Sequence, residues 1–221
     1  MVDLLYKWPG AARFGSRIPK EKIYDYGHVS PAVREKFVLE VQRITWAYKL
    51  AESTINLPGD ASVPEIQVFQ IETKTGDVDD QVLATIDKAI HYPLVFEVTR
   101  ATAGQPQIRM TAAHKQVVSG APKLSDYFST GWLPAAVERR SLPTAITLAS
   151  LYVAILDPLT PVTLRPGEEL ASVADRLAIV RKLEREITAL ERKLRTEQQL
   201  NRKIELRRTL KTRQQELEQQ R

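Results

Sequence analysis

The sequence has no cysteine and only three histidines among its 221 residues. Without cysteine there are no disulfides, thiolate metal sites, iron–sulfur clusters or cysteine nucleophiles. Three scattered histidines, His28, His91 and His114, do not favour a multi-histidine metal site. We therefore expect no metal and no cofactor, unless carboxylates hold Mg²⁺.

Several familiar sequence signals are also missing. There is no Gly-x-x-x-x-Gly-Lys-Ser/Thr loop, no Gly-x-Gly-x-x-Gly turn and no Gly-x-Ser-x-Gly elbow. The longest apolar stretch, residues 143–156, is shorter than the ~20 residues that span a bilayer. The first residues show no charged-then-apolar leader. We expect a cytoplasmic protein that does not contact membranes.

The positive charge is concentrated in the last quarter of the chain. The whole sequence has 32 Lys or Arg and 27 Asp or Glu, a net charge of +5. Residues 176–221 contain 14 basic and 7 acidic residues, a net charge of +7, so the preceding 175 residues carry 18 basic and 20 acidic residues and a net charge of −2. Any polyanion or acidic partner should therefore meet this C-terminal segment.

Residues 1–160 predict an α/β body, with α+β as the alternative, in which helices flank a small mixed sheet. After an irregular arm at 1–29, Ser30 and Pro31 begin a predicted helix that ends near Glu52, because apolar residues recur every three or four positions. Strands are predicted at 65–75, 94–99 and 107–113, and a helix at 79–90. We interpret 114–141 as a long loop, 143–156 as a buried helix and 157–167 as a proline-rich linker.

Residues 168–221 contain neither glycine nor proline and predict a basic helical extension. Val173, Val180, Ile187 and Leu194 repeat every seven residues, which is typical of a coiled-coil seam. The apolar stripe then resumes out of phase at Leu206. One interpretation is a single long helix with a phase shift. The other, slightly favoured, is an antiparallel hairpin in which Leu194 faces Leu206.

One pattern in the body suggests catalysis. Glu72 and Lys74 lie two residues apart on a predicted strand and so share a face, and Asp60 lies upstream. Carboxylates that hold Mg²⁺ beside a lysine form the Asp…Glu-x-Lys pattern of restriction-type nucleases. The alternative is an exposed salt-bridged strand end.

Two further sets of residues are candidates for binding. The seam residues predict a protein contact, or self-association, through Leu183, Ile187, Leu190, Leu194, Leu206 and Leu210. Basic residues predict contact with a nucleic-acid backbone at Arg13, Arg17, Lys20, Arg202, Lys203, Arg207 and Arg208. Trp8, Phe14, Trp46 and Trp132 would either stack on bases or pack against the body.

Segments spread over nearly the whole chain resemble the bacterial domain of unknown function 4391. They read IPKEK at 18–22, ITWAYKL at 44–50, TIN at 54–56, EIQVF at 65–69, IDKAI at 86–90 and EQQLNRK at 197–203. Members of that family are often encoded beside helicases and DNA methyltransferases in restriction-like defence clusters. The resemblance thus implies a part in antiviral defence, without family catalytic residues to carry over.

The leading hypothesis is a non-enzymatic accessory subunit of a bacterial, restriction-like DNA-processing complex. It would dock on a helicase, methyltransferase or nuclease through the C-terminal extension. The alternatives are a metal-dependent nuclease that uses Asp60, Glu72 and Lys74, and a protein that binds nucleic acid without sequence preference.

Overall fold

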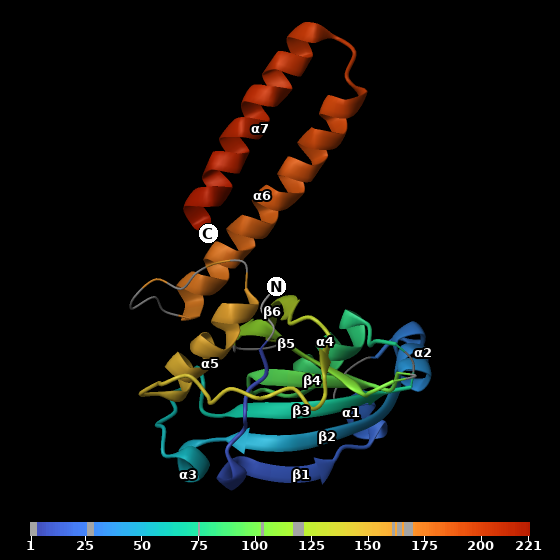
Figure 1. Cartoon of the computed structure of the whole chain (residues 1–221), viewed down its shortest axis with the longest axis vertical. Helices are drawn as coiled ribbons and strands as arrows, with labels where there is room; N and C mark the ends of the chain where they lie inside the picture. The colour runs from blue at the N-terminus through green and yellow to red at the C-terminus, as the bar shows by residue number, and fades with distance from the viewer. Residues whose placement is uncertain are drawn as a thin grey trace. The chain divides into compact units, whose positions relative to one another are not determined.

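The computed structural model describes residues 4–25, 29–74, 76–102, 104–116, 122–160, 162, 165 and 170–221, and it divides the chain into two compact units (Figure 1). The first, residues 1–159, is called the body here, and the second is residues 160–221. The body contains, in chain order, η1 (Gly10–Ala12), β1 (Arg13–Arg17), α1 (Lys20–Asp25), α2 (Pro31–Glu40), β2 (Val41–Leu50), α3 (Glu52–Ile55), β3 (Ile66–Thr73), α4 (Asp80–Ala89), β4 (Leu94–Arg100), β5 (Gln107–Gln116), β6 (Lys123–Ser129), β7 (Leu133–Pro134), α5 (Leu148–Leu156) and η2 (Asp157–Leu159).

The described strands form one seven-stranded mixed sheet in the order β1-β2-β3-β4-β5-β6, with β7 also paired to β5. Only β3 and β4 run parallel, and α4 connects them; the other pairs are antiparallel. The predicted α/β class, a mixed sheet flanked by helices, is confirmed. The strands predicted at 65–75, 94–99 and 107–113 correspond to β3, β4 and β5, and the helix predicted at 79–90 is α4.

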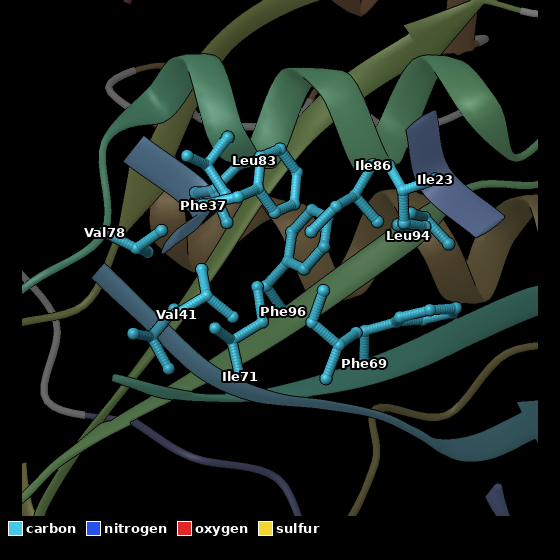
Figure 2. Packing of buried hydrophobic residues seen from close by; sticks show 13 residues of the cluster. Ile23, Phe37, Val41, Phe69, Ile71, Val78, Leu83, Ile86, Leu94 and Phe96 are labelled. Atoms are coloured by element: carbon cyan, nitrogen blue, oxygen red, sulfur yellow. The ribbon is translucent and has the colours of Figure 1, made fainter. Parts of the chain in front are cut away.

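One face of the sheet packs against α1, α2 and α4 to form the main core (Figure 2). Alternate residues of the central strands, such as Phe69 and Phe96, point toward Leu83 and Ile86 of α4 and Phe37 of α2. Each of these side chains is almost fully buried. Burying a side chain of this size is worth about 1.5–3 kcal/mol, so this layer holds the body together.

The predicted helix at 31–52 is wrong in its second half, which is the strand β2. Only α2 (Pro31–Glu40) is helical, with Ser30 as its N-cap. The pairing of β2 with β3 shifts register between Val41 and Arg43 and again between Trp46 and Tyr48. The bulge between Val41 and Arg43 inserts one residue, so Val41 and Ile44 of the main core lie three apart instead of two. Ala47 and Leu50 are buried outside that core and continue the same spacing. That spacing imitates a helical stripe.

Two other regions are more regular than predicted. Residues 114–141 are not one long loop, because the end of β5, β6 and β7 lie within them. The residues of β6 are mostly half-buried, so their sequence shows no clear alternation. The predicted irregular arm contains β1, which forms an edge of the sheet and has a bulge at Gly15, where φ is +74°.

The predicted buried helix exists but begins later, at Leu148, after a Thr147–Ser150 capping box. Within the described chain, no helix combines the length and the apolarity needed to cross a membrane. The predicted linker at 157–167 begins with the 3-10 helix η2 (Asp157–Leu159), and residues 161, 163, 164, 166 and 167 of it lie outside the described residues. The chain is helical again from residue 170.

The second unit is a helical hairpin made of α6 (Leu170–Thr196) and α7 (Leu200–Gln220) (Figure 1). Of the two interpretations of the C-terminal segment, the hairpin is therefore the one observed. The turn is stabilised by the Glu197 carboxylate, which accepts the backbone N–H groups of Gln198 and Gln199 at 2.9 Å. An ion pair of 3.0 Å between Arg213 and Glu186 defines the register of the two helices.

Asp79 links two helices of the core layer and provides a test of stability against pH. Its carboxylate caps α4 by accepting the N–H of Gln81 at 2.8 Å, and it forms an ion pair with Lys36. The bond from Lys36, followed by that from Gln81, lowers the pKa of Asp79. A carboxyl whose pKa is lower in the folded than in the unfolded protein stabilises the fold fully at any pH above its unfolded-state pKa. That contribution is lost as the pH falls through its folded-state pKa.

We therefore expect Asp79→Ala to lower the free energy of unfolding by about 1 kcal/mol at neutral pH. The difference from the unmodified chain should shrink below the ordinary Asp pKa of about 3.9. Urea denaturation at several pH values measures it. Asp80→Asn is the matched control, because burial raises the pKa of Asp80. If Asp79→Ala lowered the free energy of unfolding by the same amount at every pH, the stabilising role of the ionised Asp79 carboxylate would be refuted.

Candidate functional site

The three residues of the predicted nuclease site are not brought together. Asp60 precedes β3 and Glu72 lies near its end, so roughly 20 Å of strand separates them. The Asp60 carboxylate accepts hydrogen bonds from Ser62 and from the N–H of Val63, and these lower its pKa. Among the described residues, no group of three or more His, Asp or Glu side chains is arranged to hold a metal ion.

The other two members of that set have structural partners. Glu72 pairs with Arg43 on the neighbouring strand at 3.5 Å. The Lys74 ammonium donates to the carbonyl of Val38, near the C-terminus of α2, at 2.7 Å. A positive charge is favourable there because the helix dipole places partial negative charge on the last carbonyls. Glu72 is thus salt-bridged near the strand end, as in the alternative interpretation, but its partner is Arg43, and Lys74 is engaged by α2 instead.

Lys20, predicted to bind nucleic acid, acts on the same helix end. Its ammonium donates to the carbonyls of Phe37 and Val41, and burial lowers its pKa. Arg13 and Arg17 are exposed on the edge strand β1. The two arginines are therefore accessible to a ligand, whereas the Lys20 ammonium is already engaged by backbone carbonyls of the protein.

The four aromatic residues have different surroundings. Trp8 is buried, and Trp132 lies beneath two guanidinium groups, with Arg100 4.0 Å from its ring centre. Phe14 is half exposed and stacks on Trp46 with ring centres 4.0 Å apart. Packing therefore accounts for Trp8 and Trp132, and only Phe14 presents an open ring.

The body also contains a buried ion pair that the sequence did not reveal. Lys115 and Asp87 are almost completely buried and lie 2.8 Å apart. The Lys115 ammonium also donates to the backbone carbonyls of Asp87, Ile90 and Tyr92, at and just beyond the end of α4. The Tyr127 hydroxyl donates to the Asp87 carboxylate at 2.8 Å. Burial lowers the pKa of Lys115 and raises that of Asp87. With every ammonium hydrogen engaged, the pair joins β5 to α4 and is closed to ligands.

A second buried carboxylate, Glu97 on β4, lies on the opposite face of the sheet. It accepts a hydrogen bond from the Trp8 indole at 2.7 Å, a bidentate contact from Arg139, and a bond from Gln70 at 3.1 Å. Arg139 also donates to the carbonyl of Tyr6 at 2.8 Å. This cluster connects the N-terminal segment and residue 139 to the sheet.

The predicted seam residues lie between the two helices of the hairpin. Leu183 is buried, and the others are half-buried: Ile187, Leu190, Leu194, Leu206 and Leu210. Counting from the Arg213–Glu186 pair places Leu206 beside the turn of α6 that holds Leu194. The seam is therefore used at least partly within the hairpin itself.

Two apolar residues that the sequence reasoning did not single out are exposed at the start of α7. Leu200 is 69% exposed and Ile204 is 41% exposed. Arg207 and Lys211 follow at helical spacing on the same face. We call Leu200, Ile204, Arg207 and Lys211 the α7 face. The signal was present in the sequence, because Leu200 and Ile204 are out of phase with Leu206 and Leu210.

The basic residues of the hairpin differ in whether they are paired. Arg213 pairs with Glu186 and Glu216, and Arg221 pairs with Glu184 and Glu218. Ten others form no ion pair within the described part of the hairpin: Lys182, Arg185, Arg192, Lys193, Arg195, Arg202, Lys203, Arg207, Arg208 and Lys211. Four of the seven nucleic-acid candidates, Arg202, Lys203, Arg207 and Arg208, belong to this group.

Comparisons with known proteins give one result about identity. Neither the curated proteins nor the solved structures contained a match to the chain. The family model of a domain of unknown function, DUF4391, matches residues 7–217, which include both the body and nearly all of the hairpin. The chain is thus a member of the DUF4391 family.

Proposed function

We propose that this protein is a non-catalytic accessory subunit of a bacterial DNA-processing complex that defends against foreign DNA. It docks on a helicase, methyltransferase or nuclease through its C-terminal hairpin. The observation that carries the proposal is the α7 face, where Leu200 and Ile204 are exposed in line with Arg207 and Lys211.

The composition of the α7 face fits a protein partner. Burying apolar surface contributes about 25 cal/mol per Å², so Leu200 and Ile204 are suitable anchors for an apolar groove. Arg207 and Lys211 make no ion pair in the described hairpin and would complement acidic residues at the rim of that groove. The partner surface should therefore be acidic around an apolar centre.

The state of the candidate catalytic residues supports a role without catalysis. Glu72 pairs with Arg43, Lys74 caps α2, and Asp60 stabilises its own loop at the other end of β3. The resemblance to family members encoded beside helicases and methyltransferases directs the choice of partner toward DNA-processing enzymes.

Affinity purification from the native host tests the proposal. The variant Leu200→Glu/Ile204→Glu removes both anchors, and acids near the N-terminus of α7 favour the helix dipole, so the hairpin should remain folded. The matched control is Ile146→Glu, because Ile146 of the body is 81% exposed. We expect the control to recover the DNA-processing partner normally and the double variant to recover at least about tenfold less.

Circular dichroism should show unchanged helix content in both variants. Equal recovery of the partner by the two variants would refute docking through the α7 face. Recovery of no DNA-processing protein by the unmodified chain would refute the assembly itself.

A further inference from the structure

The outer face of α6 has the properties of an anion-binding surface. The acidic side chains that form ion pairs within the described hairpin are Glu184, Glu186, Glu216 and Glu218, and Arg213 and Arg221 take all four. On α6, Arg185 and Arg192 therefore have no acidic partner within the described residues. Their charge is available to an external ligand.

The geometry of this surface is regular. A shallow groove of about 590 Å³ is lined by Arg181, Glu184, Arg185, Thr188, Ala189, Arg192 and Lys193. Glu184 is neutralised by its ion pair with Arg221, and the other six residues are called the α6 face. All six are exposed. They lie on the side of α6 opposite the buried seam position Val180, and at 1.5 Å per residue they extend over roughly 18 Å. The α6 face is thus a linear array of cations.

The chemistry of the α6 face favours phosphate over protein. Guanidinium groups match phosphate oxygens in a bidentate geometry, and Arg is the preferred residue for such contacts. Protein interfaces need a large apolar or aromatic anchor at their centre, and the α6 face has only Ala189 and the short side chain of Thr188. Duplex DNA presents one negative charge per 1.7 Å of its axis, which suits a row of cations of this length.

We propose that the α6 face binds the phosphodiester backbone of nucleic acid without sequence preference. The binding goes beyond the proposed docking function, since it uses a different helix and needs no partner protein. Its affinity comes from charge, so it falls steeply with salt as condensed counterions are released. No base contact is involved.

Fluorescence anisotropy of the full-length chain with a labelled duplex of about 20 base pairs and arbitrary sequence tests the inference. The variant Arg185→Gln/Arg192→Gln/Lys193→Gln removes three charges of the α6 face. The matched control, Lys7→Gln/Lys88→Gln/Lys123→Gln, removes three exposed charges of the body at positions that were not predicted to contact nucleic acid. At about 100 mM salt, we expect the α6 variant to bind at least about tenfold more weakly and the control to change by less than about twofold.

The slope of log K against log salt should also become shallower by about 2–3 in the α6 variant, since each lost phosphate contact removes about 0.9. Three outcomes would overturn the inference: no binding by the unmodified chain, equal weakening in both triple variants, or displacement of the duplex by poly-glutamate at equal charge. The α6 variant should still co-purify with the partner protein. A negative result for nucleic-acid binding would therefore leave the proposed docking function untouched, and the reverse also holds.

Discussion

Replacing Lys115 with methionine should lower the free energy of unfolding of the body by about 3–5 kcal/mol. The ammonium of Lys115 makes a 2.8 Å ion pair with Asp87 and also donates to three backbone carbonyls. Both side chains are fully buried, so the substitution leaves an uncompensated carboxylate inside the core. It also removes the positive charge from the C-terminus of α4.

Urea denaturation followed by circular dichroism measures this loss, and Lys123→Met on the exposed start of β6 is the matched control. The control should change stability by less than about 0.5 kcal/mol. The double variant Lys115→Met/Asp87→Asn should recover part of the loss, because it removes the unpaired charge. A loss below about 1 kcal/mol for Lys115→Met would show that the pair is not the core element described here.

Substituting Glu97 with alanine should cost about 3 kcal/mol, the second large effect in the body. The substitution removes the acceptor of three donors, the Trp8 indole, the Arg139 guanidinium and the Gln70 amide. Because Trp8 is buried beside Glu97, its fluorescence should shift toward that of an indole in water as the N-terminal segment loosens. Denaturant unfolding and the emission maximum report the two effects independently.

Two variants serve as controls for Glu97→Ala. Glu97→Gln keeps a carbonyl acceptor for the Trp8 indole and loses only the charge opposite Arg139, so it should cost less than the alanine variant. Glu72→Ala removes an exposed carboxylate with a 3.5 Å ion pair and should change stability by less than about 0.5 kcal/mol. If Glu97→Ala were as mild as Glu72→Ala, the Glu97 cluster would not anchor the N-terminal segment.

The core elements of the body could be predicted because local patterns agree with their tertiary positions. In β3 the β-branched residues and Phe69 follow one another in an extended run, and Asp79 marks the first turn of α4. The strand β2 could not be predicted in this way. A bulge places Val41 and Ile44 of the main core three residues apart, and Ala47 and Leu50 are buried outside that core. Together they repeat every three residues, a period closer to a helix than to a strand.

The candidate functional residues show the same division between local and long-range information. The charge of the hairpin and the seam of α6 are local properties that the sequence displays. The partners of Lys20 and Lys74 cannot be seen in the local sequence, because both lysines are distant in sequence from the end of α2 that they cap. Pairing also decides which cations are available, because Arg221 neutralises Glu184, which lies 37 residues away in sequence, and Arg213 neutralises Glu186 on the other helix.

The amount of partner recovered per mole of bait from the native host is the most direct test of the central claim that this protein acts through its hairpin. The comparison requires the full chain, the Leu200→Glu/Ile204→Glu variant and a chain lacking residues 168–221, with cooperative urea unfolding confirming a folded body in each. We predict that the full chain recovers a DNA-processing protein, that the truncated chain recovers none, and that the double variant resembles the truncated chain. Equal recovery by the folded truncated chain would contradict the account and assign docking to the body.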